Sequence, residues 1–436
     1  MAIPLQALYD ELRVAEGPSR AKAHAASRED PFILKLAHLV LSHGVQIRAS
    51  DIHLEPTARG ARVRYRIDGL LHEMLMLPEE IRDPLLRAIK VQANMATDAV
   101  GRSKPQDGRI DFADGGRTLD LRLSSFPTLY GDVLAIRLLD RSSAALALDQ
   151  VGFAPALLEA FGRLIRRPNG MLLVTGPAGS GKTTTLYAAL NHIRAPHIKI
   201  VTLEDPVEYQ VDEIDQAQVN PAAGLTFASG LRAILRQDAN VILVGEIRDK
   251  ETAEIAVRAA LTGHLVLSTM HTRNAAGTMS RLIDMGIEPH LIAASVIGVV
   301  AQRLVRLVCP GCAAHDPRAA EPFTALWRQE TGKAPPPEHL VGLRRGAGCT
   351  ACSQTGYKGR SGIFEFLVID EGSARRMLDR ADGPLFAPAG PAGGFQSMRA
   401  HGLEKAACGL TTVTEVLRVG GETEERSPEP PAFADA

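Results

Sequence analysis

The fold of this 436-residue chain is decided by residues 171–183, with the sequence Met-Leu-Leu-Val-Thr-Gly-Pro-Ala-Gly-Ser-Gly-Lys-Thr. Residues 171–175 are a short apolar run that predicts a buried strand. Residues 176–183 follow directly as Gly-x-x-x-x-Gly-Lys-Thr, and the small side chains let backbone N–H groups wrap around phosphates. A helix that begins near Lys182 would point its positive end at the same phosphates. The stretch therefore predicts a binding loop for a nucleoside triphosphate.

This loop predicts both ATP and Mg²⁺ as ligands. Lys182 would neutralise the β- and γ-phosphate oxygens, and the Thr183 hydroxyl would ligate Mg²⁺. A glycine-rich turn without a ligand is the alternative, but every fixed position of the motif is present after an apolar strand. The remaining predicted nucleotide contacts are Gly176, Pro177, Ala178, Gly179, Ser180, Gly181 and Thr184.

The composition indicates a chain of ordinary folded domains. Apolar residues make up 45% and charged residues 23%, and the length suggests about two to four domains. A net charge of −1 and 4% aromatic residues argue against nucleic-acid binding, since neither a basic field nor many stacking surfaces are available. Residues 1–6 do not resemble a signal peptide, and the longest apolar stretch, 291–301, is too short to cross a bilayer. We therefore expect a cytoplasmic protein.

The first part of the chain predicts a small α+β domain over residues 31–140. A helical pattern covers 32–43, an alternating hairpin covers 62–75 with its turn at Asp68-Gly69, and a helix follows near 84–96. A second hairpin is expected over 109–140. Residues 1–30 are expected to be a flexible lead-in, and 141–150 a linker.

The second part predicts an α/β core over residues 151–308. Buried strands are expected at 171–175, 198–203, 241–244 and 265–269, alternating with helices. This alternation is typical of a mainly parallel sheet that binds its ligand at the carboxyl ends of the strands.

Acidic and histidine residues follow the predicted strands of this core. Glu246 comes just after the strand at 241–244, where a carboxylate can reach the γ-phosphate and orient an attacking water. A solvated acid at a strand end is the alternative. The other candidates are Glu204, Asp205 and Glu208 as Mg²⁺-shell or water-positioning acids, and His264 and His271 as γ-phosphate sensors or structural histidines.

In combination and in this order, the motifs resemble those of the ATPases of type II secretion and type IV pilus assembly, the secretion ATPase E and PilB class. Residues 204–209 are similar to the family's aspartate box, 231–249 to its Walker B region and 262–272 to its histidine box. The first domain resembles the family through 49–56, 66–69 and 105–110, and the resemblance covers about 31–420.

The resemblance implies a homo-hexameric ring of subunits with a RecA-like P-loop NTPase core and a preceding PAS-like domain. Nucleotide would lie between the two domains, with Glu246 as catalytic glutamate and Glu208 as the aspartate-box acid. Arg109 and Arg122 would reach the γ-phosphate as arginine fingers. The implied partners are inner-membrane platform and docking proteins, which would hold the ring peripherally at the inner membrane. The thirty residues before the first domain are too few for the family's usual docking domain.

Two Cys-x-x-Cys pairs predict a zinc module over residues 309–352. Cys309 and Cys312 are separated from Cys349 and Cys352 by 36 residues, and four thiolates from two tight turns suit tetrahedral Zn²⁺. Redox dithiols are the alternative, but no thioredoxin-like pattern surrounds either pair. The resemblance adds that assembly ATPases carry this module and retraction ATPases lack it. A helical region is expected over 353–420 and a disordered tail over 421–436.

The function expected from the motifs and the resemblance is ATP hydrolysis that powers pseudopilus assembly and protein export in a type II secretion system. A type IV pilus assembly ATPase is the nearest alternative. A ring ATPase that translocates nucleic acid and a non-catalytic nucleotide-dependent scaffold are the others.

Overall fold

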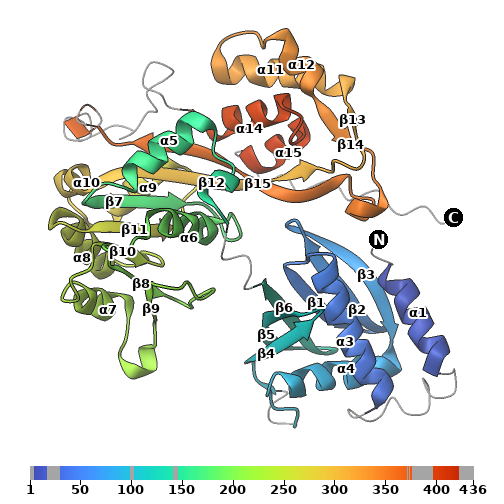
Figure 1. Ribbon diagram of the computed structural model, residues 1–436. Helices are drawn as coiled ribbons and strands as arrows, with labels where there is room; N and C mark the ends of the chain where they lie inside the picture. Colours follow the sequence, from blue (N-terminus) through green and yellow to red (C-terminus); the bar gives the residue numbers. More distant parts are fainter. Residues whose placement is uncertain are drawn as a thin grey trace. The chain divides into compact units, whose positions relative to one another are not determined.

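The computed structural model describes residues 4–16, 30–98, 103–140, 146–370, 372, 374–375 and 396–421. The chain divides into two compact units, Met1–Ser143 and Ala144–Ala436 (Figure 1).

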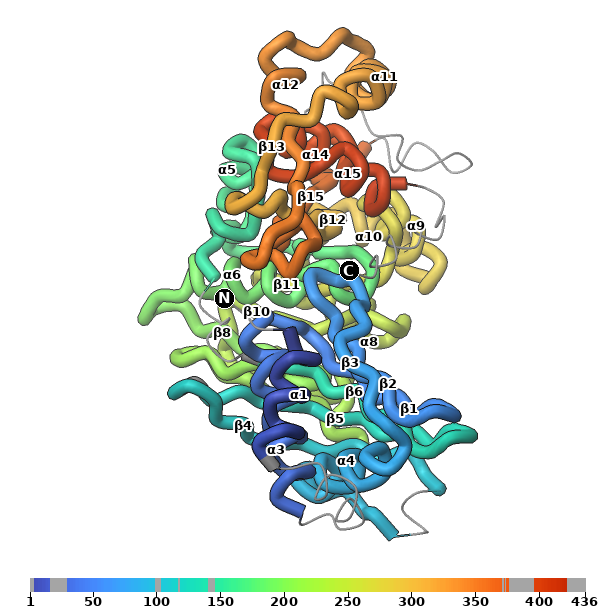
Figure 2. The backbone as a smooth tube through the Cα atoms, turned by 90° about the vertical axis from the view of Figure 1, so that its right-hand side faces the viewer, coloured from blue at the N-terminus to red at the C-terminus, as the bar shows by residue number. Residues whose placement is uncertain are grey.

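The N-terminal unit is built on a six-stranded antiparallel sheet with the strand order β3-β2-β1-β6-β5-β4. Residues of β1 alternate between buried and half-buried, because successive side chains of a strand point to opposite faces. Three helices supply the apolar cover of the buried face (Figures 1 and 2). The elements are α1 (Leu5–Glu16), α3 (Pro31–Gln46), β1 (Asp51–Thr57), β2 (Gly60–Ile67), β3 (Leu70–Pro78), α4 (Glu79–Gln92), β4 (Gln106–Asp114), β5 (Arg117–Thr128) and β6 (Gly131–Asp140).

The structure corrects the expectation of a flexible lead-in over residues 1–30. Helix α1 occupies residues 5–16, and Leu5 and Tyr9 are buried in the core of the unit, with Leu12 packed beside them. These positions are spaced i, i+4 and i+7, so they form one apolar stripe along the helix. The remaining part of that prediction, residues 17–29, lies outside the described residues.

The predicted hairpin over 62–75 is confirmed, and the one over 109–140 is a three-stranded meander. Strands β2 and β3 pair around Asp68 and Gly69, which adopt the left-handed conformation that a tight two-residue turn requires. In the second region β4, β5 and β6 pair in succession. Its second turn, between Thr128 and Gly131, was missed because it lies among apolar residues that resemble strand.

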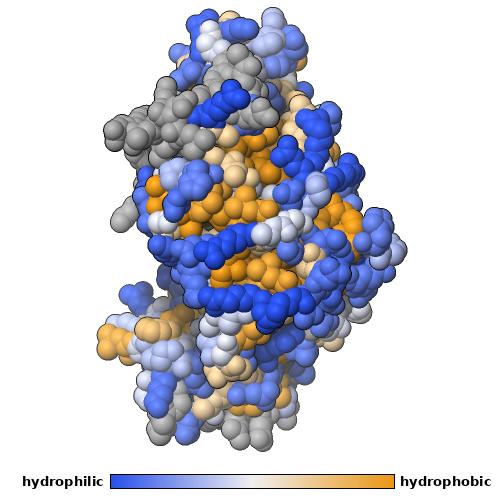
Figure 3. Space-filling view, turned by 90° about the vertical axis from the view of Figure 1, so that its left-hand side faces the viewer, coloured by the Kyte–Doolittle hydropathy of each residue, from blue (hydrophilic) through white to orange (hydrophobic). Residues whose placement is uncertain are grey.

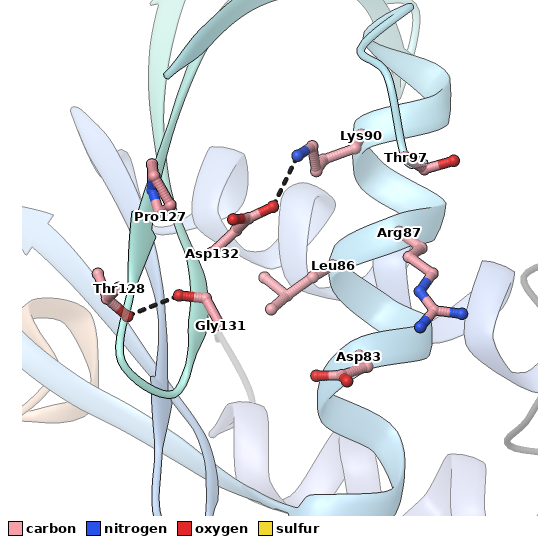
Figure 4. A pocket seen from close by; sticks show the side chains of 9 residues that line it. All are labelled: Asp83, Leu86, Arg87, Lys90, Thr97, Pro127, Thr128, Gly131 and Asp132. Atoms are coloured by element: carbon pink, nitrogen blue, oxygen red, sulfur yellow. Dashed lines mark hydrogen bonds and ion pairs between the residues drawn. The ribbon is translucent and has the colours of Figure 1, made fainter. Parts of the chain in front are cut away.

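A buried ion pair fastens α4 to the start of β6 (Figure 4). Lys90, on α4, is 2% exposed, and its Nζ lies 2.7 Å from Oδ2 of Asp132. The two side chains point toward one another beside a cavity of about 140 Å³. Because removal of one partner leaves an uncompensated buried charge, this pair holds the helix in one position on the sheet.

The C-terminal unit contains a seven-stranded sheet with the order β15-β12-β7-β11-β10-β8-β9. Neighbouring strands pair in parallel, except β12 and β15, which are antiparallel. The four strands expected from the sequence are confirmed as β7, β8, β10 and β11. The strands are β7 (Gly170–Thr175), β8 (Ile200–Glu204), β9 (Asp215–Gln218), β10 (Val241–Val244), β11 (Leu265–Met270), β12 (Val296–Val308) and β15 (Tyr357–Val368).

Helices cover both faces of this sheet. Alternate residues of β7 enter different cores: Met171 and Leu173 pack with α7 to α10, whereas Leu172 and Val174 pack with α5 and α6. A continuous apolar run such as 171–174 is the pattern of a strand buried on both faces. The helices are α5 (Pro155–Leu164), α6 (Lys182–Ile193), α7 (Phe227–Ile234), α8 (Lys250–Leu261), α9 (Ala275–Asp284) and α10 (Pro289–Ser295), with short 3₁₀ turns η3 (Leu148–Gln150) and η4 (Pro221–Ala223).

The expected helical region over 353–420 is wrong at its start. Residues 357–368 form β15, which pairs with β12 and lies at one edge of the seven-stranded sheet. Ile363 and Phe364 enter the cores on opposite faces, as a strand requires. Helices begin later, with α14 (Met398–Ala407) and α15 (Val413–Gly420). The segment between β12 and β15 contains β13 (Ala313–His315), η5 (Pro317–Ala319), α11 (Ala320–Thr331), α12 (Pro337–Gly342), β14 (Arg344–Gly346) and η6 (Thr350–Cys352).

A buried carboxylate anchors α15 to β12. Glu415 is 1% exposed, and its oxygens accept hydrogen bonds from Nη2 of Arg306 at 2.6 Å and from Nε and Nη2 of Arg418 at 2.7 and 2.8 Å. The Arg306 guanidinium also lies 4.0 Å from the ring centre of Tyr357 on β15. Burial alone would raise the pKa of Glu415, but the hydrogen bonds from Arg418 and Arg306 outweigh it and hold the pKa at about 2.

This anchor predicts a loss of stability in acid. The folded state keeps Glu415 ionised down to about pH 2, whereas the unfolded chain protonates this residue below its ordinary pKa of 4.5. Its contribution to stability is therefore fully present above pH 4.5 and is lost as the pH falls toward about 2. We expect the free energy of unfolding to fall by about 3 kcal/mol from this residue over that window. Denaturant unfolding of the wild type and of Glu415→Gln at a series of pH values measures it. The difference in the free energy of unfolding between the wild type and the variant should become smaller in acid. A difference that does not change with pH would contradict the stabilising role of the ionised Glu415.

Apolar residues also lie on the surface. Figure 3 shows hydrophobic residues gathered on one face between bands of hydrophilic residues. None of the helices in the described part of the chain has the length and apolar character needed to span a bilayer. Within the described C-terminal unit, the large apolar side chains that are most exposed are Leu261, Val341, Val368, Leu410 and Leu417.

Candidate active site

The phosphate loop connects β7 to α6 as the sequence predicts. Strand β7 ends at Thr175, and α6 begins at Lys182. Gly176, with φ 149°, is tightly enclosed, since a Cβ atom there would lie 2.4 Å from the Gln302 carbonyl oxygen. Gly181 adopts the left-handed conformation, with φ 87°, at the N-cap of α6. Both positions therefore require glycine, and their geometry fits a loop that surrounds phosphates with backbone amides.

Lys182 is held inside the loop. Its Nζ donates to the carbonyl oxygens of Gly176 at 2.9 Å and Pro177 at 3.0 Å. The side chain is 9% exposed, and burial lowers the pKa of Lys182 to about 8, with Glu246 acting in the opposite direction. The ammonium group thus stays mostly charged at neutral pH and is already placed where phosphate oxygens would replace the carbonyl oxygens.

Acidic residues meet this loop at the carboxyl ends of the parallel strands. A cavity of about 180 Å³ opens there, between the ends of β8, β10 and β11 and the first turn of α6. It combines a cation, a hydroxyl and several carboxylates, which suits a metal-bound triphosphate. Its lining residues include Lys182, Thr183, Glu204, Asp205, Glu208, Glu246 and His271.

Glu246 lies next to two basic side chains. Its Oε1 is 2.5 Å from Nη2 of Arg248, and its Oε2 is 3.6 Å from Nε2 of His271. Partial burial, together with the nearby Lys182 charge, lowers the pKa of His271 below its ordinary 6.5, so the imidazole is neutral at pH 7. A neutral imidazole can exchange hydrogen bonds with a carboxylate, a water or a phosphate. Arg248 was not singled out from the sequence, although it follows Glu246 by two positions.

The three acids of residues 204–208 are not equivalent. Glu204 is 3% exposed, and both of its oxygens already accept hydrogen bonds from protein side chains. Asp205 is exposed, and Glu208 is half-buried, and both line the cavity. The burial of Glu204 and the exposure of Asp205 could not be predicted from the sequence pattern. They differ only because successive side chains at the end of β8 point to opposite faces of the sheet.

The structure separates the two histidines that were expected to bracket the nucleotide. His271 follows β11 and lines the cavity. His264 precedes β11, beside Gly170 at the other end of β7, and its Nδ1 is 3.1 Å from the Ala259 carbonyl oxygen. A strand of this length puts the two ends about 17 Å apart. The structure therefore does not bring His264 to the phosphate loop of the same chain, and its role stays a prediction.

Arg109 and Arg122 are neighbours on β4 and β5 of the N-terminal unit. They are direct cross-strand partners, and the buried carboxylate of Asp120 lies 2.6 Å from Nε of Arg109 and 3.9 Å from Nε of Arg122. Asp120 therefore positions both guanidinium groups, of which that of Arg109 is the more exposed. Their contact with nucleotide stays a prediction.

Four of the five cysteines of the second unit form one cluster. Their Sγ atoms all lie within 4.8 Å of one another, with separations of 3.8 Å for Cys309–Cys349 and for Cys312–Cys352 and 3.7 Å for Cys349–Cys352. Zn–S bonds of about 2.3 Å place the sulfurs of a tetrahedral site about 3.8 Å apart. The backbone N–H of Gly356 donates to Sγ of Cys352 at 3.3 Å, as is usual for metal thiolates. The residues present therefore fit a structural Zn²⁺ ion.

Known proteins with the same sequence pattern are secretion proteins. The family model for Type II/IV secretion system protein matches residues 26–418. Type II secretion system protein E of Klebsiella pneumoniae is 44% identical over 401 residues, which cover 90% of this chain and 77% of the relative. Type II secretion system ATPase E of Vibrio cholerae is 43% identical over 397 residues, covering 91% and 77%.

Solved structures show the same fold at low identity. The ATPase DotB of Legionella pneumophila superposes with a TM-score of 0.64 at 22% identity, covering 88% of this chain and 95% of DotB. The pilus retraction motor PilT, solved with bound ADP, superposes with a TM-score of 0.57 at 23% identity, covering 89% of this chain and 98% of PilT. These likenesses confirm the predicted α/β architecture.

Proposed function

Because the chain belongs to the Type II/IV secretion system protein family and is an ATP hydrolase of the type II secretion class, we propose that it drives pseudopilus assembly and protein export as a ring of six copies. The observation that supports this most is the single cavity in which the phosphate loop faces Glu208 and Glu246. A cation on one side and carboxylates on the other suit a triphosphate with its metal ion.

The phosphate loop would bind ATP and leave its γ-phosphate facing the acids. Backbone amides of residues 176–181 and the N-terminus of α6 would hold the β- and γ-phosphates, and Lys182 would exchange its two carbonyl partners for phosphate oxygens. Thr183 is the residue that would hold Mg²⁺, which, when bound, neutralises charge on the phosphate oxygens.

Hydrolysis requires a water placed in line with the bond to the leaving ADP. Glu246 would accept a hydrogen bond from that water, while His271 and Arg248 keep the carboxylate oriented. Glu208, with Asp205, would place the metal's water ligands or the attacking water. The products are ADP and inorganic phosphate.

Arg109 and Arg122 would act as arginine fingers from the N-terminal unit. Asp120 holds the two guanidinium groups side by side. Two neighbouring guanidinium groups could together stabilise the negative charge that develops on the transferred phosphoryl group. Phosphate release by an Arg109→Ala variant tests this role, because hydrolysis at the wild-type rate would exclude it.

The finer parts of the proposal concern the assembly around the ring. We expect a cytoplasmic protein held at the inner membrane by platform and docking proteins of the secretion machinery. The tetracysteine cluster would carry one Zn²⁺ ion that closes the segment between β12 and β15. A type IV pilus assembly ATPase remains the second candidate, and the bound membrane partners recovered with the full chain would separate the two. Salt-sensitive DNA binding would instead favour a nucleic-acid motor.

Replacing Lys182 with Ala is expected to weaken ATP binding by about 100-fold, because a charge-assisted contact to phosphate is lost. Isothermal titration with a non-hydrolysable ATP analogue measures the dissociation constant. Lys199→Ala, which removes a lysine outside the cavity, is the matched control and should bind as the wild type does. Unchanged affinity in Lys182→Ala would mean that the nucleotide binds elsewhere.

A further inference from the structure

Glu204 is a buried carboxylate that the proposed chemistry does not use. It ends β8, and no ion pair to it is present among the described residues. Its oxygens accept from the Tyr187 hydroxyl, from Oγ1 of Thr202 at 2.6 Å and from Nε2 of Gln216 at 3.2 Å. A carboxylate has about four lone-pair sites, so most of its capacity is already used by the protein.

Tyr187 connects this carboxylate to the phosphate-loop helix. It lies on α6, is 1% exposed, and follows Thr183 by four residues, so the two side chains lie on the same side of the helix one turn apart. Burial and the neighbouring Glu204 charge raise the pKa of Tyr187, so its hydroxyl stays protonated and donates. The helix that would hold the metal ligand Thr183 is thus joined directly to the end of β8.

The same network holds the far end of the acidic segment. The ring of Tyr209 meets that of Tyr187 edge to face, with centres 4.5 Å apart and planes at 81°. Gln216, on β9, places its Nε2 3.2 Å from the Tyr209 carbonyl oxygen, and its Oε1 accepts from the Val211 N–H at 2.7 Å. Asp205 and Glu208 lie between these two attachments, and both line the cavity.

We propose that Tyr187 and Glu204 are positioning residues, which hold the segment 205–208 in register with the phosphate-loop helix so that Asp205 and Glu208 meet the metal-bound nucleotide. Glu204 acts through the protein rather than as a metal ligand. Tyr187 links α6 to this segment through its hydrogen bond to Glu204 and its ring contact with Tyr209, and its hydroxyl also accepts from Nε2 of Gln216 at 3.3 Å. The inference rests on the proposed role of Glu208.

Tyr187→Phe tests the link, since it removes the hydroxyl and keeps the ring. The turnover number is expected to fall about 10-fold while the dissociation constant of the nucleotide stays within about twofold. Tyr65→Phe is the matched control: Tyr65 is fully buried in the N-terminal unit, and its hydroxyl donates to the Val40 carbonyl oxygen at 2.7 Å. Both variants should lose similar thermal stability, and only Tyr187→Phe should lose turnover. An unchanged turnover number, or a loss equal to that of the control, would overturn the proposal.

Two further measurements separate positioning from other roles. In a background that carries both Asp205→Asn and Glu208→Gln, Tyr187→Phe should lower the turnover number by no more than about twofold, because its effect passes through those two residues. A full 10-fold loss on top would overturn the inference. Glu204→Gln should leave the Mg²⁺ concentration for half-maximal activity unchanged. A 10-fold rise in that concentration would mean that Glu204 is itself a ligand of the metal and would overturn the proposal. If Glu208→Gln alone keeps full activity, the proposed role of Glu208 fails. That result can be told apart from a failure of the positioning role, which the Tyr187→Phe and Glu204→Gln variants test.

Discussion

Replacing Glu246 with Gln will leave ATP bound and stop its hydrolysis. Gln has nearly the same shape as Glu but does not carry the negative charge that polarises a water for attack, so the turnover number should fall about 1,000-fold. The phosphate loop does not include Glu246, so the dissociation constant for ATP should change little. Phosphate release and nucleotide binding, measured on the assembled protein, give the two numbers separately.

Glu254→Gln is a suitable control for this experiment. Glu254 lies on α8, is partly exposed, and its Oε1 is 3.7 Å from Nζ of Lys250, a surface contact of little energetic weight. It should hydrolyse ATP as the wild type does. A Glu246→Gln variant with ordinary turnover would transfer the catalytic role to another acid of the cavity, with Glu208 the first to examine.

If the tetracysteine cluster carries the proposed zinc ion, removing two of its thiolates will unfold the segment between β12 and β15. Cys349→Ser with Cys352→Ser leaves two thiolates, too few for a structural Zn²⁺ site. The segment has only a small apolar core, so metal binding should contribute much of its folding free energy, which reaches about 10 kcal/mol in small zinc domains. The zinc content measured by elemental analysis should fall from one ion per chain to none, and a protease in limited amounts should cut the variant within residues 313–348.

Cys408→Ser is the control, because Cys408 is exposed and lies outside the cluster. It should keep its zinc and its resistance to protease. A wild-type protein that folds fully and contains no metal would reject the zinc assignment and leave the cysteines as a reduced cluster.

The sequence predicted the strand, the loop and the helix around residues 171–183 correctly, because their signal is local. A phosphate loop needs a buried strand, glycines that tolerate left-handed backbone and a lysine at the helix start, and all of these lie within residues 171–183. The acids at the ends of β8 and β10 were found for the same reason, since the carboxyl ends of parallel strands meet at one edge. The spatial clustering of four cysteines from two distant pairs was also predictable, because metal-ligand spacing is local to each pair.

Features that depend on distant partners were harder to predict. The alternating pattern of β15 was overlooked because the strand pairs with β12 across the whole cysteine segment. The network of Tyr187, Glu204 and Gln216 joins three elements, so no single stretch of sequence reveals it. His264 and His271 flank the same strand in the sequence. Because the six residues of β11 are extended, the two histidines lie at opposite ends of that strand.

The antiparallel pairing of β12 and β15 has a consequence for how this protein can be rebuilt. Val308 and Tyr357 are register partners, so residues 309–356 leave the sheet and return to it at the same place. In topological terms the whole cysteine-containing segment is one long hairpin loop. Such an insertion can be shortened, lengthened or exchanged between related ATPases without altering the strand order of the sheet. The reason is that the two residues at its ends, Val308 and Tyr357, are already paired side by side.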